Sequence, residues 1–98
     1  MKETEILKTV CEIVSEHLEM PIEEVENHLD TPFLDYPDNE SGEPYCYPLD
    51  YTELIMAMEE EFGIEIDPYI EEEGKLKAIN DIVRFVALHE IDSFGKDE

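Results

Sequence analysis

The sequence predicts an all-α fold, a bundle of three longer helices and one short helix. Apolar residues recur three or four positions apart in three segments of the 98-residue chain, which is the spacing of one helix face. Turn-forming residues are concentrated between residues 30 and 48 instead. An apolar content of 42% is sufficient for one core to which each helix contributes a stripe. Residues 1–98 are therefore expected to form a single domain.

The first helix is predicted from about Glu3 to Leu18. Pro21 stops it, and residues 21–25 are expected to form a short helical turn with proline at its first position, where the missing N–H has no helical partner. The apolar face of the first helix comprises Ile6, Leu7, Val10, Ile13, Val14, His17 and Leu18.

Residues 30–48 are predicted to form an extended loop. This segment is rich in proline, glycine, asparagine and aspartate and shows neither a strand period nor a helix period. Its aromatic and aliphatic side chains are expected to anchor parts of it to the core, whereas Cys46 is expected to be exposed. The candidate anchors are Phe33, Leu34, Tyr36, Tyr45 and Tyr47.

The second long helix is predicted to begin at Pro48, because proline is favoured at the first helical position. Asp50 and Glu53 lie in or near its first turn, where the helix dipole favours anions. Gly63 supplies the expected C-terminal stop. The predicted buried face comprises Tyr51, Leu54, Ile55, Met58 and Phe62.

The rest of the chain is predicted to form two more helices. Residues Pro68–Glu73 are expected to form a short helix that ends at Gly74, and the last helix is expected over about Ala78–His89. Residues 92–98 are expected to be a disordered tail.

Charge is the most unusual property of the composition. The net charge is −22, and no Lys or Arg occurs between Thr9 and Gly74, a span that holds 21 carboxylates. Nucleic-acid binding is not expected, because it requires cations that displace counterions from phosphates. An anionic membrane surface is disfavoured for the same reason of sign. The expected partners are basic proteins and, weakly, divalent cations, and self-repulsion favours a monomer.

The expected location is the cytoplasm. No apolar run approaches the ~20 residues of a membrane-spanning helix. The first eight residues, MKETEILK, lack the apolar core of a signal peptide. Cys11 and Cys46 form neither a close pair nor a metal-binding spacing, as is usual for a reduced protein.

The run LDYTELIMAMEEEFGIEI, residues 49–66, resembles the second helix of acyl carrier proteins. The segment ILKTVCEIVSEHLEMPIEEVENHLDTPF is similar to the first helix of that family and the start of its loop, and LKAINDIVRFV is similar to its closing helix. The resemblance implies an acyl-carrier-like four-helix bundle that acts in fatty acid or polyketide biosynthesis. It also implies an acyl or peptidyl thioester on a phosphopantetheine arm, which a serine oxygen holds in an Asp-Ser-Leu motif.

The sequence departs from the family pattern at this motif. Tyr47, Pro48 and Leu49 stand in its place, and proline has no hydroxyl to which an arm could attach. The preceding loop, which includes DYPDNESGEPYCYP, is also longer than the family pattern. No cofactor is therefore expected at Pro48. The resemblance further implies that partner enzymes dock on the acidic second helix, through Asp50, Glu53, Met56, Glu59 and Glu60.

Three hypotheses follow, and none of them is enzymatic, because the three histidines are scattered and no local catalytic motif accompanies Cys46. The first is a degenerate carrier that docks basic partners. The second is a working carrier with phosphopantetheine on Ser41, the serine nearest to the expected position. The third is an acidic protein that responds to divalent cations, which prefer oxygen ligands. Its candidate ligands are Asp30, Asp35, Asp38, Glu40 and Glu43.

Overall fold

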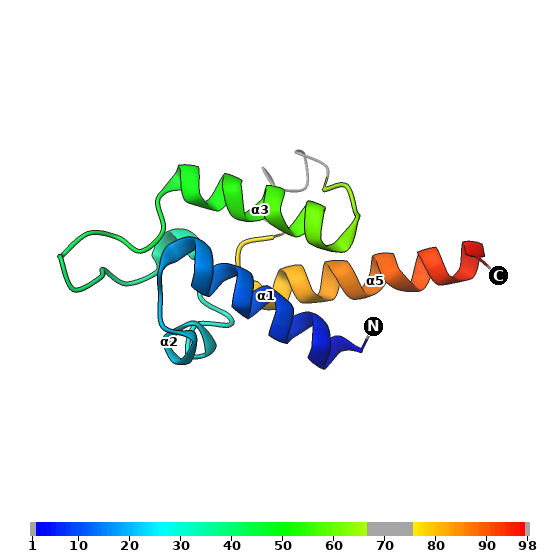
Figure 1. The fold of residues 1–98 in the computed structure, drawn as a ribbon, viewed down its shortest axis with the longest axis horizontal. Helices are drawn as coiled ribbons and strands as arrows, with labels where there is room; N and C mark the ends of the chain where they lie inside the picture. Colours follow the sequence, from blue (N-terminus) through cyan, green and yellow to red (C-terminus); the bar gives the residue numbers. More distant parts are fainter. Residues whose placement is uncertain (1, 67–75, 98) are drawn as a thin grey trace.

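The computed structural model describes the backbone of residues 2–66 and 76–97, and the side chains of these residues as far as Leu88. Within this part of the chain it contains four α-helices and no strand, which confirms the predicted all-α class. The elements are α1 (Glu3–Leu18), α2 (Ile22–Glu26), the 3-10 helix η1 (Phe33–Asp35), α3 (Pro48–Phe62) and α5 (Ile79–Asp97) (Figure 1). The predicted short helix at Pro68–Glu73 lies outside the described residues.

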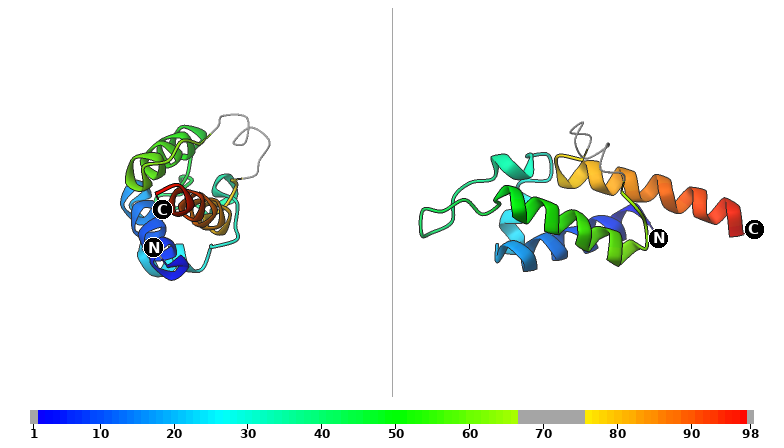
Figure 2. Two further views of the ribbon diagram at one scale, coloured as in Figure 1. Left: turned by 90° about the vertical axis from the view of Figure 1, so that its right-hand side faces the viewer. Right: turned by 90° about the horizontal axis from the view of Figure 1, so that it is seen from above.

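The core lies where α1, α3 and α5 meet. Helix α1 packs against α5, α3 and α2, and Figures 1 and 2 show α1 between α3 and α2. Each long helix contributes apolar side chains with no exposed surface, because each presents one apolar stripe to its neighbours. These side chains are Ile6, Val10 and Val14 from α1, Leu54 and Met58 from α3, and Ile79, Ile82 and Val86 from α5.

Helix α1 has the predicted bounds, but its end differs from the prediction in two details. Glu19 adopts a left-handed conformation with φ of 52° and ends the helix before Pro21 is reached. Pro21 then precedes α2 instead of forming its first residue. His17 is exposed and not part of the buried face, so the imidazole stays hydrated near the negative end of the helix dipole.

Three of the five candidate anchors hold the long loop, Phe33, Tyr36 and Tyr45, whereas Leu34 and Tyr47 are exposed. Phe33, Tyr36 and Cys46 are all buried, so the expectation of an exposed Cys46 was wrong. The Phe33 N–H donates to the carbonyl oxygen of Lys77 at 2.8 Å, and the Tyr45 hydroxyl donates to Glu24 on α2 at 3.2 Å. Between these anchors, the segment that leads to α3 projects from the bundle (Figure 1).

Helix α5 extends past the predicted end at His89 to Asp97, and the expectation of a disordered tail over residues 92–98 stays a prediction. No proline interrupts this stretch, and its only glycine, Gly95, lies near the end of the helix. Among the described residues, no helix combines the length and the apolar character that crossing a membrane requires.

Candidate functional site

The N-terminus of α3 is capped by a side chain of its own first turn. Pro48 is the first helical residue, as predicted. The backbone N–H of Tyr47 donates to the Asp50 carboxylate at 2.9 Å, a bond typical of helix N-termini. The negative charge of Asp50 thus lies at the positive end of the helix dipole.

This arrangement does not fit an attached phosphopantetheine. The arm needs a side-chain oxygen as its attachment atom, and the pyrrolidine ring of Pro48 has none. The side chains of Pro48 and Leu49 are exposed, so position 48 is accessible but chemically inert. The first turn of α3 therefore begins a helix and holds the Asp50 carboxylate, but it has no nucleophile at residue 48.

The outer side of α3 carries a mixed apolar and acidic stripe. Leu49 and Met56 lie seven residues apart and are 69% and 60% exposed. Glu53 lies four residues after Leu49, Glu60 lies four residues after Met56, and both glutamates are exposed. At 3.6 residues per turn these four side chains share one face. We call Leu49, Glu53, Met56 and Glu60 the outer stripe.

The five docking residues predicted on α3 fall into two groups. Glu53, Met56 and Glu60 belong to the outer stripe. Asp50 and Glu59 are half-buried and hold the backbone instead: Asp50 accepts from Tyr47, and Glu59 accepts the Ile66 N–H at 2.8 Å. Leu49 was not among the docking residues predicted from the sequence, although its seven-residue spacing from Met56 places both side chains on one helix face.

Ser41, the alternative attachment residue, lies in a tight turn of the projecting loop. Its N–H donates to the Asn39 side chain at 2.9 Å, and Gly42 adopts φ of 84°. Asn39 and Glu43 are joined by a backbone hydrogen bond of 2.7 Å. Ser41 is exposed, but it does not precede a helix as the attachment serine of the family pattern does.

The structure does not gather the acidic loop residues into a metal centre. Among the described residues, no group of three or more His, Cys, Asp or Glu side chains is arranged to hold a metal ion. Asp30 accepts a hydrogen bond from the Asn80 amide at 2.7 Å, and Asp35 lies on η1. Asp38 pairs with Pro44 in an isolated bridge, while Glu40 and Glu43 lie exposed around the turn. Weak binding of divalent cations to these carboxylates stays a prediction, which rests on their overall negative charge and not on a defined site.

The melting temperature is expected to rise by several degrees with NaCl and further with millimolar Mg²⁺ at matched ionic strength. About 0.15 M salt shortens the Debye length to about 8 Å and weakens carboxylate repulsion, and a divalent ion also bridges neighbouring carboxylates. Thermal unfolding followed by circular dichroism measures both effects. Equal melting temperatures in all buffers would show that these charges are too well hydrated to destabilise the fold.

Neither cysteine has the properties of a nucleophile. Burial raises the pKa of the Cys46 thiol to about 12, with a further contribution from Asp50. Burial also raises the pKa of the Cys11 thiol to about 11, and Glu26 and Glu12 add to the shift. Both groups are therefore neutral thiols at physiological pH, and the thiolate is the reactive form.

Comparison with known proteins identifies the family. The chain is 37% identical to the acyl carrier protein of Thermosynechococcus vestitus over 86 residues, which cover 88% of this chain and 93% of that protein. It is 41% identical over 86 residues to the acyl carrier protein of Prochlorococcus marinus, at 88% and 94% coverage. A match to the acyl carrier protein of Nitratidesulfovibrio vulgaris, 51% identical over 39 residues, covers 40% of this chain and 49% of that protein.

No family model matches the sequence, and no solved structure matches it. The two long matches nevertheless span most of this chain and nearly the whole of each relative. The helical bundle agrees with the fold that the resemblance implied. This chain belongs to the acyl carrier protein family.

Proposed function

We propose that this chain is a non-enzymatic member of the family that docks basic partner proteins through the outer stripe of α3 and carries no phosphopantetheine arm at residue 48. The observation that carries the proposal is Pro48 as the first residue of α3. A proline here preserves the helix start and removes the oxygen that would hold the arm. The partner-facing surface is thus kept while the carrier chemistry is lost.

The docking half of the proposal is supported by the composition of the outer stripe. Glu53 and Glu60 form no ion pair with another described residue, so their charges are available to a partner. Leu49 and Met56 supply apolar contact area between these charges, and Met adapts well to different partner surfaces. An apolar centre with a charged rim is a common composition for a protein–protein interface.

Charge also defines the partner. A net charge of −22 attracts a basic surface over long range and repels an acidic one. The partner is therefore a protein with a basic patch, and its association with this chain slows as salt rises.

The first test is the modification state. Incubation with coenzyme A and a broad-specificity phosphopantetheinyl transferase is expected to leave the intact mass of the protein unchanged, because residue 48 offers no oxygen. The acyl carrier protein of Thermosynechococcus vestitus serves as the positive control in the same reaction. The readout is intact-protein mass spectrometry.

Two variants show where any modification occurs and what prevents it at residue 48. A stoichiometric mass gain that disappears in Ser41→Ala would contradict the proposal and favour a working carrier armed on the loop. Pro48→Ser measures how much of the resistance comes from the missing hydroxyl alone. We expect it to remain a poor substrate, because Tyr47 and the long projecting loop still differ from the family pattern.

A further inference from the structure

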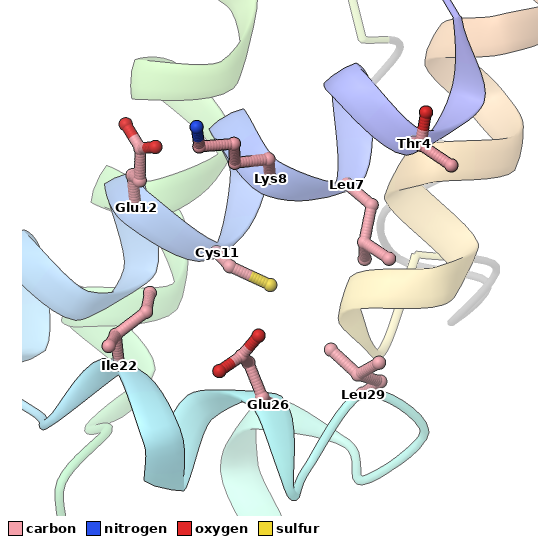
Figure 3. Close-up of a pocket in the computed structure, with 8 residues that line it drawn as sticks. All are labelled: Thr4, Leu7, Lys8, Cys11, Glu12, Ile22, Glu26 and Leu29. Carbon is pink, nitrogen blue, oxygen red and sulfur yellow. The ribbon is translucent and has the colours of Figure 1, made fainter.

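A cavity of about 390 Å³ opens between α1 and α2 (Figure 3). None of its lining residues belongs to α3, so it is separate from the outer stripe. The volume falls within the range of about 300–1,000 Å³ that is typical of small-molecule sites. The lining residues are Thr4, Leu7, Lys8, Cys11, Glu12, Ile22, Glu26 and Leu29.

The inner wall of the cavity is apolar, and one carboxylate faces it. Figure 3 shows the side chains of Leu7 and Leu29 and the Cys11 sulfur directed into the space between the helices. The Glu26 carboxylate points from α2 towards Cys11. Cys11 stays a neutral thiol, so Glu26 is the charged group that faces this inner wall, whereas Lys8 and Glu12 line the cavity on the side away from Leu29.

The charges around the cavity favour a cation as its ligand. Glu26 forms no ion pair with any described residue. Lys8, the basic residue of the lining, extends from α1 together with Glu12 on the side away from Leu29, whereas the Glu26 carboxylate faces the space between the helices (Figure 3). The strongly negative chain repels anionic ligands in addition. A ligand that fits both wall and charge has an aliphatic body and one cationic end.

We propose that the cavity between α1 and α2 binds a small aliphatic amine. The alkyl chain packs against Leu7, Cys11 and Leu29, and the ammonium group pairs with the Glu26 carboxylate. This site is independent of docking at α3, so either proposal can fail without the other. Each methylene that enters the cavity is expected to tighten binding about fourfold, the equivalent of ~0.8 kcal/mol.

The experiment is a titration of the ¹⁵N-labelled full chain, followed by NMR, with hexylammonium, butylammonium, hexanol and hexanoate at constant ionic strength. Hexylammonium is expected to shift the amides of Leu7, Cys11 and Glu26. Because it has two more methylenes, it should bind about sixteenfold more tightly than butylammonium. It should also bind more tightly than hexanol, with hexanoate the weakest. Hexanoate binding at least as tight as hexylammonium, or amine-induced shifts concentrated on α3, would overturn the proposal.

A matched pair of variants tests the role of Glu26. Glu26→Gln is expected to weaken hexylammonium binding about threefold to fivefold, as for a partly exposed ion pair. Glu23→Gln removes the same charge from an exposed position of α2 outside the cavity and should leave the affinity unchanged. Equal losses in both variants would mean that the amine responds only to net charge, and the site assignment would be wrong.

A third variant fills the cavity. Cys11→Leu places a larger side chain where the sulfur points and is expected to abolish hexylammonium binding while the protein stays folded. If this variant does not fold, the comparison of Glu26→Gln with Glu23→Gln still tests the site assignment.

The last titration uses a blocked tripeptide, acetyl-Gly-Lys-Gly-amide, as the ligand. Tighter binding of this peptide than of hexylammonium would assign the cavity to a lysine of a partner protein and overturn the small-molecule proposal.

Discussion

Replacing Phe33 with alanine is expected to lower the free energy of unfolding by about 3–5 kcal/mol, the usual cost of truncating a buried phenylalanine. The Phe33 side chain is only 1% exposed. Its ring packs against Tyr36 and Tyr51, with centroid separations of 5.4 and 5.8 Å. The backbone of Phe33 also bonds to Lys77, so this residue joins the loop, α3 and the segment before α5.

Urea unfolding followed by circular dichroism at 222 nm measures this loss. A domain of this size loses roughly 4–8 °C of melting temperature per kcal/mol, so a decrease of more than ten degrees is expected. Leu34→Ala is the matched control, because Leu34 is the next residue and is 56% exposed. It should change the stability by no more than about 0.5 kcal/mol. Similar losses in the two variants would show that Phe33 does not anchor the loop.

The second large effect is expected at the outer stripe. The double charge reversal Glu53→Lys with Glu60→Lys should slow association with a basic partner tenfold to a hundredfold at low salt, because it places like charges opposite one another. The helical circular dichroism should not change, since both side chains are exposed and neither holds the backbone. The partner is obtained with the wild-type chain as bait, and its association rate is measured by biolayer interferometry.

A second double reversal separates local contact from net charge. Glu5→Lys with Glu16→Lys alters two exposed carboxylates of α1 and changes the net charge by the same amount. This control should slow association much less. Met56→Ala should mainly raise the dissociation rate, because it removes a contact and no charge. If the partner binds the Glu53 and Glu60 reversal as well as the wild type, the docking surface lies elsewhere, and the loop over residues 35–47 is the next candidate.

Helix bounds that depend on local signals were predictable from the sequence. Helix α3 begins at Pro48 and is followed by Gly63 in the left-handed conformation, and both residues act through their own backbone restrictions. The burial of Cys46 was not predictable in this way. It depends on Phe33 and Tyr36 holding the loop against the core, and the spacing of residues within the loop does not encode those contacts.

In the candidate site, too, some features were predictable from the sequence and others were not. The outward position of Glu53, Met56 and Glu60 followed from helical periodicity. The role of Glu59 did not, because its bond to the Ile66 N–H depends on how the chain turns after α3. The cavity also had no signal in the sequence. It arises from the way α2 and the following residues lie across α1, a tertiary arrangement that leaves Leu7 and Leu29 only partly buried.

Pro48 also affects the unfolded chain. A proline ring restricts its own φ in every conformation, so the unfolded ensemble loses less entropy when α3 forms than it would with a serine at this position. At a site whose native φ suits proline, such a difference amounts to about 0.4–1 kcal/mol. The residue that removes the attachment oxygen thus also makes folding entropically easier, in a chain whose net charge of −22 is expected to oppose compaction.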